Sequence, residues 1–271
     1  MDWSRIKTIF IIAFLILDLF LLSQLLTKHR SYQFEVKSDT SFEENLKTDG
    51  IEYKELPKDF ASDHYLSANT KTFSEEEIKE VNGLKNQRLF SEDGTILHAE
   101  LTKPISMKDK EDFSDIDEFV KTNVLYGEKY GFWNFDKEEG TITYYQNYHD
   151  QPLFMNRSAH LVFFLNDANE IQSYEQTMLD TVEPISDKEE VYPAIRALEA
   201  LYRKGVLKPN SKVIKSELGY YTLVNMEATQ VLTPTWRFLV EYEGQQENLL
   251  VNAFEGQIIQ ANQGNEKNIM E

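Results

Sequence analysis

The 271-residue chain contains no cysteine, and it has only five histidines, seven prolines and eleven glycines. Without cysteine it can form no disulfide, carry no lipid on a cysteine and use no thiol nucleophile. The histidines are isolated, and none stands in a spacing that places two metal ligands on one helix face. The glycines form neither a phosphate-binding loop nor the Gly-x-Ser-x-Gly turn of serine hydrolases. The sequence therefore predicts no metal site, no cofactor and no catalytic nucleophile.

Basic residues are also scarce, since 28 Lys and Arg stand against 46 Asp and Glu and give a formal net charge of −18. A surface this acidic is repelled by the phosphates of nucleic acids and by anionic lipid headgroups. Nucleic acid is therefore excluded as a partner. Aromatic residues make up 13% of the chain, which argues against disorder and favours a sheet-rich fold.

One long apolar run stands out at residues 8–26, where fourteen of nineteen residues are Ile, Leu or Phe and only Asp18 is charged. As a helix the run reaches about 28 Å, close to the ~30 Å hydrocarbon core of a bilayer. Its apolar side chains favour insertion by about 6 kcal/mol, against about 3 kcal/mol for one central aspartate. No pair of small residues follows that could form a cleavage site. The run predicts an uncleaved signal-anchor helix.

The charges that flank this helix do not decide its orientation. Arg5 and Lys7 precede the apolar run, and Lys28 and Arg30 follow it. The absence of cysteine suits an exported bacterial domain, although it is also common in cytosolic proteins. We expect a short cytoplasmic tail at residues 1–7 and an extracellular domain after the helix.

Asp18 lies near the middle of the predicted membrane span. An ionisable group at this depth is expensive to bury in lipid and tends to face a protein partner. Phe14, Leu21 and Leu22 fall on the same helix face and complete a predicted contact surface for a partner helix. The alternative is that Asp18 is protonated and tolerated in an otherwise very apolar helix.

Beyond the membrane span the sequence predicts a polar stalk at residues 27–50 and two units of helix and antiparallel sheet, at 51–180 and 181–262, with a polar tail at 263–271. Capping boxes predict helices that begin at Ser74, Ser114 and Ser186 and end near Gly83, Gly127 and Gly205. Pro193 falls inside the third helix, which therefore either kinks there or begins near that residue.

A period of two replaces the helical period after residue 140. Strands are predicted at residues 141–146, 160–165 and 170–177, and again around residues 236–242, 249–254 and 258–259. Turns are predicted at 149–152, 166–169 and 243–245. The order of a helix followed by antiparallel strands therefore occurs twice, which indicates an α+β fold built from two related units.

Exposed carboxylates and aromatics leave an enzyme or glycan-binding function open. Glu138-Glu139 and Glu189-Glu190 are adjacent pairs that could serve glycoside hydrolysis, and Trp133, Trp236 and Tyr220-Tyr221 could bind sugar rings. In a chain this acidic a carboxylate pair is more simply a solvated face, and these aromatics are more simply core. A cleft with two converging carboxylates would favour the enzyme.

Three segments resemble a known family. The chain opens with MDWS at residues 1–4 before the apolar run, and KTFS at 71–74 and LKNQ at 84–87 flank the first predicted helix. These segments resemble the YycI (WalI) family, single-pass regulatory proteins of Gram-positive bacteria. Residues 186–259, which include LLVNAFEGQI at 249–258, are similar to a PepSY-type unit, a helix followed by a hairpin. The resemblance implies that the second α+β unit of the exported domain is PepSY-like.

The family resemblance also implies partners. It implies a membrane protein, with its N-terminus in the cytoplasm, that associates with the sister protein YycH and the sensor histidine kinase WalK (YycG). Together they adjust two-component signalling that controls cell-wall metabolism. It implies no catalytic residues, so the sequence predicts a non-enzymatic regulator. The alternative is a membrane-anchored cell-envelope hydrolase or glycan-binding protein.

Overall fold

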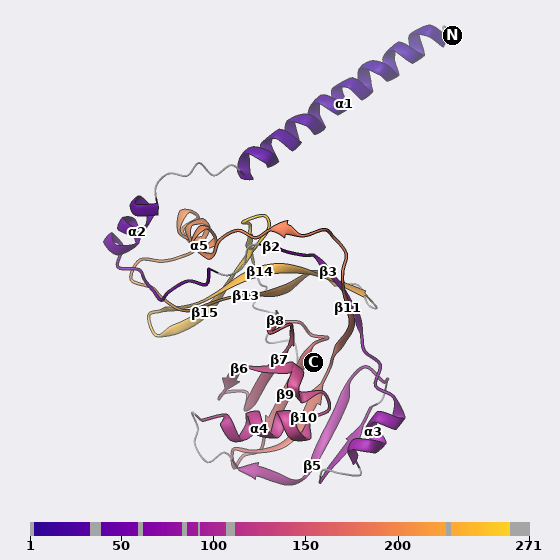
Figure 1. Cartoon of the computed structure of the whole chain (residues 1–271), viewed down its shortest axis with the longest axis vertical. Coiled ribbons are helices and arrows are strands. Elements are labelled where there is room, and N and C mark those ends of the chain that lie inside the picture. The colour runs from indigo at the N-terminus through magenta and orange to yellow at the C-terminus, as the bar shows by residue number, and fades with distance from the viewer. Residues whose placement is uncertain are drawn as a thin grey trace. The chain divides into compact units, whose positions relative to one another are not determined.

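The computed structural model of the chain describes residues 3–32, 39–58, 62–82, 86–91, 93–106, 112–225 and 229–260. It divides into two compact units, Met1–Gly50 and Ile51–Glu271, whose elements are drawn in Figure 1. Several predicted features lie outside the described residues, namely the polar tail at 263–271, the helix-ending Gly83 and part of the LKNQ segment.

The first unit contains two helices, α1 (Trp3–Tyr32) and α2 (Asp39–Thr48). The 30 residues of α1 span about 45 Å, so the helix extends beyond the hydrocarbon thickness of a bilayer. Residues Ile6–Ser23 have a mean hydropathy of 2.4, and none of them is buried by other parts of the chain. The chain thus has an N-terminal helix apolar enough to span a membrane, and the predicted stalk contains a helix.

The second unit alternates between strands and short helices. Its first half contains β1 (Glu52–Tyr53), β2 (Ser62–Asp63), β3 (Leu66–Thr70), α3 (Glu75–Asn82), β4 (Gln87–Phe90), β5 (Leu97–Ser106), α4 (Ser114–Asn123), the 3-10 helix η1 (Gly127–Lys129), β6 (Tyr130–Asp136), β7 (Thr141–Tyr148) and β8 (Gln151–Phe154). Its second half contains β9 (His160–Leu165), β10 (Glu170–Gln176), β11 (Leu179–Pro184), β12 (Glu189–Glu190), α5 (Ala194–Arg203), β13 (Lys212–Asn225), β14 (Thr229–Tyr242), β15 (Gln245–Asn252) and β16 (Ile258–Ile259). The mixed α+β class is confirmed.

Fourteen of these strands form one continuous sheet with two parts, joined by β8. We call the first the β7 part, in which β6, β7, β9, β10, β5 and β4 follow one another in antiparallel order. The second is the β14 part, which contains β11, β3, β14, β13, β15, β16 and β1. Strand β8 pairs with β7 on one side and with β13 on the other, and it lies between them in Figure 1. Strands β12 and β2 form a separate two-stranded sheet.

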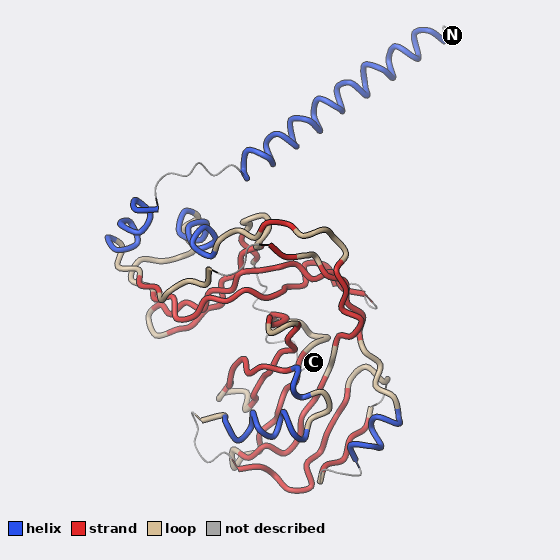
Figure 2. The backbone as a smooth tube through the Cα atoms, viewed as in Figure 1, coloured by secondary structure: helices blue, strands red, loops and turns tan. Residues whose placement is uncertain are grey.

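Helix α4 covers one face of the β7 part and α5 covers one face of the β14 part (Figure 2). In the β7 part, Ile116 and Val120 of α4 pack with Ile142, Tyr144 and Phe163 of the sheet in a buried cluster. The Tyr144 hydroxyl donates to Asp117 Oδ1 of α4 at 2.7 Å, which fixes the helix across the strands.

In the β14 part, the alternation of β14 places Trp236 and Phe238 in the core, where both are fully buried. The Trp236 indole Nε1 donates to the Tyr192 carbonyl at 2.6 Å, just before α5. Helix α5 buries Ala197, Leu198 and Leu201 along one side, as an amphipathic helix over a sheet does.

Each of the three helices predicted after the stalk is present in the described residues, but two of them differ from the prediction in detail. Helix α3 follows Ser74 with the predicted capping box. Helix α4 lies where it was expected, but its N-cap is Phe113 and Ser114 makes no cap bond; the left-handed residue after it is Tyr126, with φ 55°, and not Gly127. The third helix does not begin at Ser186, because residues 189–190 form β12 and α5 starts directly after Pro193. It ends as predicted before Gly205, with φ 68°.

Strand pairing links the beginning of the second unit to its end. Strand β1 pairs with β13, β2 with β12, and β3 with both β14 and β11. Strands β1 and β3 therefore belong to the same part of the sheet as β13 and β14, whereas β2 and β12 form the separate two-stranded sheet. The domain boundaries at 180 and 262 stay a prediction, since residues 51–271 form one compact unit.

Candidate functional site

The predicted membrane contact surface lies on α1. Phe14, Leu21 and Leu22 expose 60%, 54% and 49% of their surface, and Asp18 is also exposed. Spacings of three and four residues place all four side chains on one side of the helix. The structure therefore brings the predicted residues together on one face, and their role as contacts for a partner stays a prediction.

The histidines and carboxylate pairs do not form a chemical centre. Within the described ranges there is no group of three His, Cys, Asp or Glu side chains that could hold a metal ion. His160 is buried beside Thr177, and burial lowers its pKa to about 4 despite backbone hydrogen bonds that favour the charged form. The pairs Glu138-Glu139 and Glu189-Glu190 are exposed. The two glutamate pairs are therefore part of a solvated acidic surface, and His160 is a buried, neutral imidazole.

The aromatic candidates for sugar binding are largely internal. Trp236 and Tyr220 are buried in the β14 part, and the Tyr220 hydroxyl donates to Asp63 Oδ1 at 2.8 Å. Tyr221 and Trp133 are half-buried. Core packing therefore accounts for two of these four side chains and not for all of them, and Trp133 lies between the two parts of the sheet.

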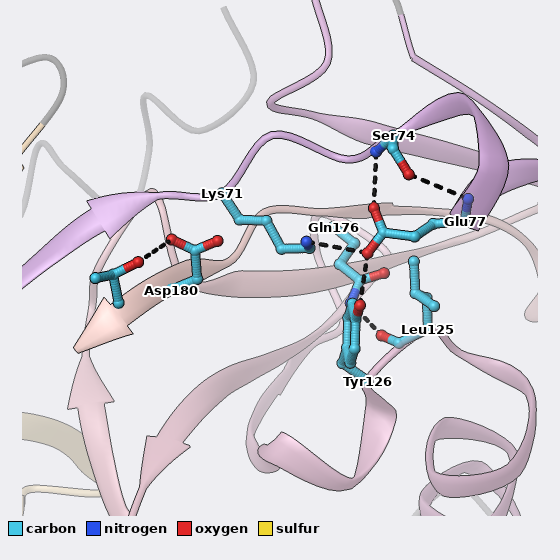
Figure 3. A network of polar contacts seen from close by, with 8 residues as sticks. Lys71, Ser74, Glu77, Leu125, Tyr126, Gln176 and Asp180 are labelled. Atoms are coloured by element: carbon cyan, nitrogen blue, oxygen red, sulfur yellow. Dashed lines mark hydrogen bonds and ion pairs between the residues drawn. The ribbon is translucent and has the colours of Figure 1, made fainter.

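A dense polar cluster in the second unit surrounds the carboxylate of Glu77 (Figure 3). Its Oε1 accepts a hydrogen bond from the Tyr126 hydroxyl at 2.5 Å and lies 3.0 Å from the Lys71 ammonium. Its Oε2 accepts from the Ser74 amide at 2.7 Å, and the Ser74 hydroxyl accepts from the Glu77 amide at 3.3 Å. One carboxylate thereby joins the segment before α3 to the turn after α4.

The electrostatics of the cluster favour one protonation state. Burial disfavours the charged form of Glu77, but hydrogen bonds from Tyr126, Ser74 and Lys71 outweigh it and lower the pKa to about 2. The same bond to Glu77, together with burial, raises the pKa of Tyr126 to about 12. The Lys71 ammonium also lies over the Tyr126 ring, 5.3 Å from its centroid. The carboxylate is therefore charged and the phenol neutral at physiological pH.

This cluster sits where the chain passes between the two parts of the sheet. The Lys71 amide donates to the Met178 carbonyl at 2.8 Å, so that the segments after β3 and before β11 run together. Gln176 Nε2 donates to the Leu125 carbonyl at 2.6 Å from the other side (Figure 3). Sequence reasoning found only the Ser74–Glu77 capping box; Lys71 and Tyr126 carry no local signal, because they meet Glu77 only in the folded chain.

The fold and the N-terminal helix define a class of protein, a mixed α+β domain preceded by a helix apolar enough to span a membrane. The chain belongs to the YycI family, because the family model described as YycI protein matches residues 30–254. This confirms the resemblance found in the sequence.

Solved structures with a similar arrangement share little sequence with the chain. An uncharacterized protein from Eubacterium rectale has 12% identity and a TM-score of 0.46, over 79% of this chain and 91% of that one. The Bacillus megaterium YpeB C-terminal domain has 14% identity and a TM-score of 0.41, over 70% and 100%. YycH from Bacillus subtilis has 13% identity and a TM-score of 0.40, over 78% and 61%. No curated protein matches the sequence.

Proposed function

We propose that the chain is a non-enzymatic, membrane-anchored regulator that associates with the sensor histidine kinase WalK and with a YycH-type sister protein. Membership of the YycI family is the observation that carries this proposal. In this arrangement α1 anchors the protein in the cell membrane with residues 1–7 in the cytoplasm. The second unit is then extracellular, and its acidic surface keeps it away from anionic headgroups.

The face of α1 formed by Phe14, Asp18, Leu21 and Leu22 supplies the contact within the membrane. Helices in lipid gain little from apolar burial, so that packing and a polar contact decide which helices associate. Asp18 is the one charged residue of the apolar run and is exposed on this face. A regulator of this kind acts by contacting one conformational state of the kinase more favourably than another.

Co-purification of the full-length protein from membranes with the kinase and the sister protein tests the proposal. The wild type is compared with Asp18→Leu and with a chain whose α1 is replaced by an unrelated membrane helix. Ser23→Leu is the matched control, because it also exchanges a polar residue for leucine but lies about 140° around the helix from Asp18.

We expect recovery of both partners with the wild type and with Ser23→Leu, reduced recovery with Asp18→Leu, and loss with the exchanged helix. Equal loss with Ser23→Leu would remove the specific role of Asp18. No association of any form of the protein would overturn the regulatory proposal and return the cell-envelope hydrolase or glycan-binding protein to first place.

A further inference from the structure

Strand β6 forms an edge of the β7 part. Among the described residues it pairs with β7 and with no other strand. Phe132 is 40% exposed and Asn134 is exposed as well, so that this strand is open to solvent. An edge strand presents amides and carbonyls that lack a partner strand, and another extended chain can add to them.

The register identifies the backbone groups that face the open edge. The Gly140 carbonyl and the Gln146 amide both bond toward β9, so that the odd-numbered residues of β7 between them face β6. Their partners on β6 include Asn134 and Asp136, whose backbone groups therefore point to β7. Phe135 lies between these two residues and points its own amide and carbonyl to the open edge.

A bulge brings two phenylalanines of β6 onto one face. Between Phe132 and Asn134 the register with β7 shifts, so that Trp133 is the extra residue of a β-bulge. Phe132 and Phe135 consequently both lie on the α4 side, where their ring centroids are 4.5 Å and 5.8 Å from that of Phe113. The backbone groups of Phe132 also point to the open edge, because its partner on β7 is an even-numbered residue. We call these three rings the aromatic patch.

Carboxylates stand at both ends of this edge. Glu128 lies just before β6, Glu138 and Glu139 lie in the turn after it, and all three are exposed. Over residues 128–139 four carboxylates stand against two lysines, and the start of α4 next to the patch, SDIDE at 114–118, adds three carboxylates and no basic residue. The aromatic patch is therefore bordered by negative charge.

This charge decides which kind of chain fits the edge. If two copies of the protein paired β6 with β6, either direction would bring exposed glutamates of both copies together, because both ends of the strand are acidic, and like charges that face each other destabilise a strand pair. An extended segment that contains Lys or Arg would meet opposite charge at both ends, and its apolar side chains would cover the patch. An apolar centre with a charged rim is the usual composition of a protein interface.

We propose that the open edge of β6, together with the aromatic patch, is a docking site for an extended basic segment of a partner protein, which adds to the sheet as a further strand. The backbone of Phe132 and Phe135 supplies hydrogen bonds, the patch supplies apolar contact, and the carboxylates select the charge of the partner. This inference is independent of the partners proposed above, because it concerns the chemistry of the edge and is tested without them.

Peptides of defined charge test the docking site on the full chain in non-ionic detergent. The probe is a peptide of alternating lysine and valine. A glutamate–valine peptide tests the selection by charge, and a lysine–valine peptide with alternate amides N-methylated keeps the charge but cannot form the hydrogen bonds of an added strand. The N-methylated peptide is needed because a bulge and charges also serve simply to protect an edge strand from aggregation.

Phe132→Lys places a positive charge in the aromatic patch. Phe90→Lys is the matched control, because Phe90 is 38% exposed and lies on β4, the strand at the opposite edge of the β7 part. If Phe132→Lys does not fold, the double substitution Glu138→Lys and Glu139→Lys replaces it, since both side chains are exposed in a turn.

We expect the lysine–valine peptide to bind the wild type and Phe90→Lys equally, and to bind Phe132→Lys or the double variant about tenfold more weakly. Hydrogen exchange followed by mass spectrometry should show slower exchange in fragments that cover β6, and no change in fragments that cover β4. The glutamate–valine and N-methylated peptides should not slow exchange in β6.

Four results would overturn the docking site. Equal binding of the N-methylated peptide would show attraction by charge alone, and equal loss of binding in Phe90→Lys would show that the contact is not at β6. No binding of the lysine–valine peptide would show that the edge accepts no basic strand. Protection of β6 that rises with protein concentration in the absence of peptide would assign the edge to a second copy of the chain.

Discussion

Glu77→Gln isolates the charge at the centre of the polar cluster. Glutamine fills the same space and still satisfies a capping box, so that the helix start at Ser74 is retained. What disappears is the negative charge that accepts from Tyr126 and pairs with Lys71. Lys71 is only 14% exposed and would be left without its counter-ion, which a partly buried charge tolerates poorly.

The pKa of Glu77 sets the scale of this effect. A shift from 4.5 to about 2 corresponds to at most about 3 kcal/mol of stabilisation by the charged form. Because the side chain is 24% exposed and glutamine keeps part of the hydrogen bonding, we expect Glu77→Gln to lower the free energy of unfolding by about 2 kcal/mol at pH 7.

The direction of the pKa shift decides how the stabilisation by Glu77 changes with pH. The folded-state pKa lies below the unfolded value, so the contribution of Glu77 is complete above pH 4.5 and is lost as the pH falls toward 2. Urea unfolding of the full chain in detergent, followed by tryptophan fluorescence, should therefore show that more than half of the difference between wild type and Glu77→Gln has vanished at pH 3.

A control on the same helix separates this effect from a general loss of charge. Glu75 is 86% exposed and pairs with Lys79 at the surface, so Glu75→Gln should leave stability unchanged. Equal destabilisation by the two substitutions would refute the conclusion that the charge of Glu77 stabilises this cluster. A difference in unfolding free energy between wild type and Glu77→Gln that stays constant from pH 7 to pH 3 would refute it as well.

Three further substitutions test close packing and a buried polar contact, each by the same unfolding measurement. Gly127→Ala should destabilise the chain by about 3 kcal/mol, because the new Cβ would lie 1.7 Å from the carbonyl oxygen of Val120; a stable variant would contradict the geometry of this turn. Gly219→Ala should cost about 2 kcal/mol through its clash with the Pro152 carbonyl, and a neutral result would show that β8 can move away. Asn156→Ala should cost about 2 kcal/mol, because Asn156 is buried and donates to side chains of β13 and β14; a neutral result would show that water replaces it.

The sequence correctly predicted those helices and strands whose local hydrophobic pattern agrees with the burial of their side chains in the folded chain. The strands predicted at 141–146, 160–165 and 170–177 are present as β7, β9 and β10. Ile142 and Tyr144 of β7 and Tyr174 of β10 belong to the buried cluster beneath α4, which their spacing of two predicted, whereas consecutive residues of β9 are buried on both of its faces. Strand β13 was missed although it has 14 residues. Its register shifts after Val213 and again after Thr222, and Gly219 interrupts its hydrophobic pattern, so the period of two is broken in the sequence.

Tertiary contacts explain the other differences. Ser186 was predicted to start a helix, but its hydroxyl accepts from the Tyr65 amide at 3.1 Å and its carbonyl lies 2.8 Å from His64 Nδ1, contacts more than 120 residues apart in the chain. The predicted surface on α1 needed only the apolar run and helical spacing. The Glu77 cluster and the contact of the Arg237 guanidinium with the Trp133 ring could not be predicted, because their members come together only in the folded chain.

Two serines test how far a capping motif can be interpreted from sequence. Ser74 directly precedes α3, and Ser114 follows Phe113 at the start of α4. Both stand three residues before a carboxylate, so the pattern treats them alike. In the structure only Ser74 is an N-cap. At the second helix the Ser114 amide donates to Asp112 Oδ1 at 2.9 Å, and Ser114 is already the first helical residue.

Ser74→Ala should therefore lower the free energy of unfolding by about 1 kcal/mol, whereas Ser114→Ala should change it by less than about 0.5 kcal/mol. Urea unfolding of the two variants in parallel measures the difference. Equal losses would mean that the motif alone decides the cap, against the geometry seen at Phe113. The expected asymmetry follows because a hydroxyl stabilises a helix start only from the residue whose backbone is still outside the helix, and only the fold determines which residue that is.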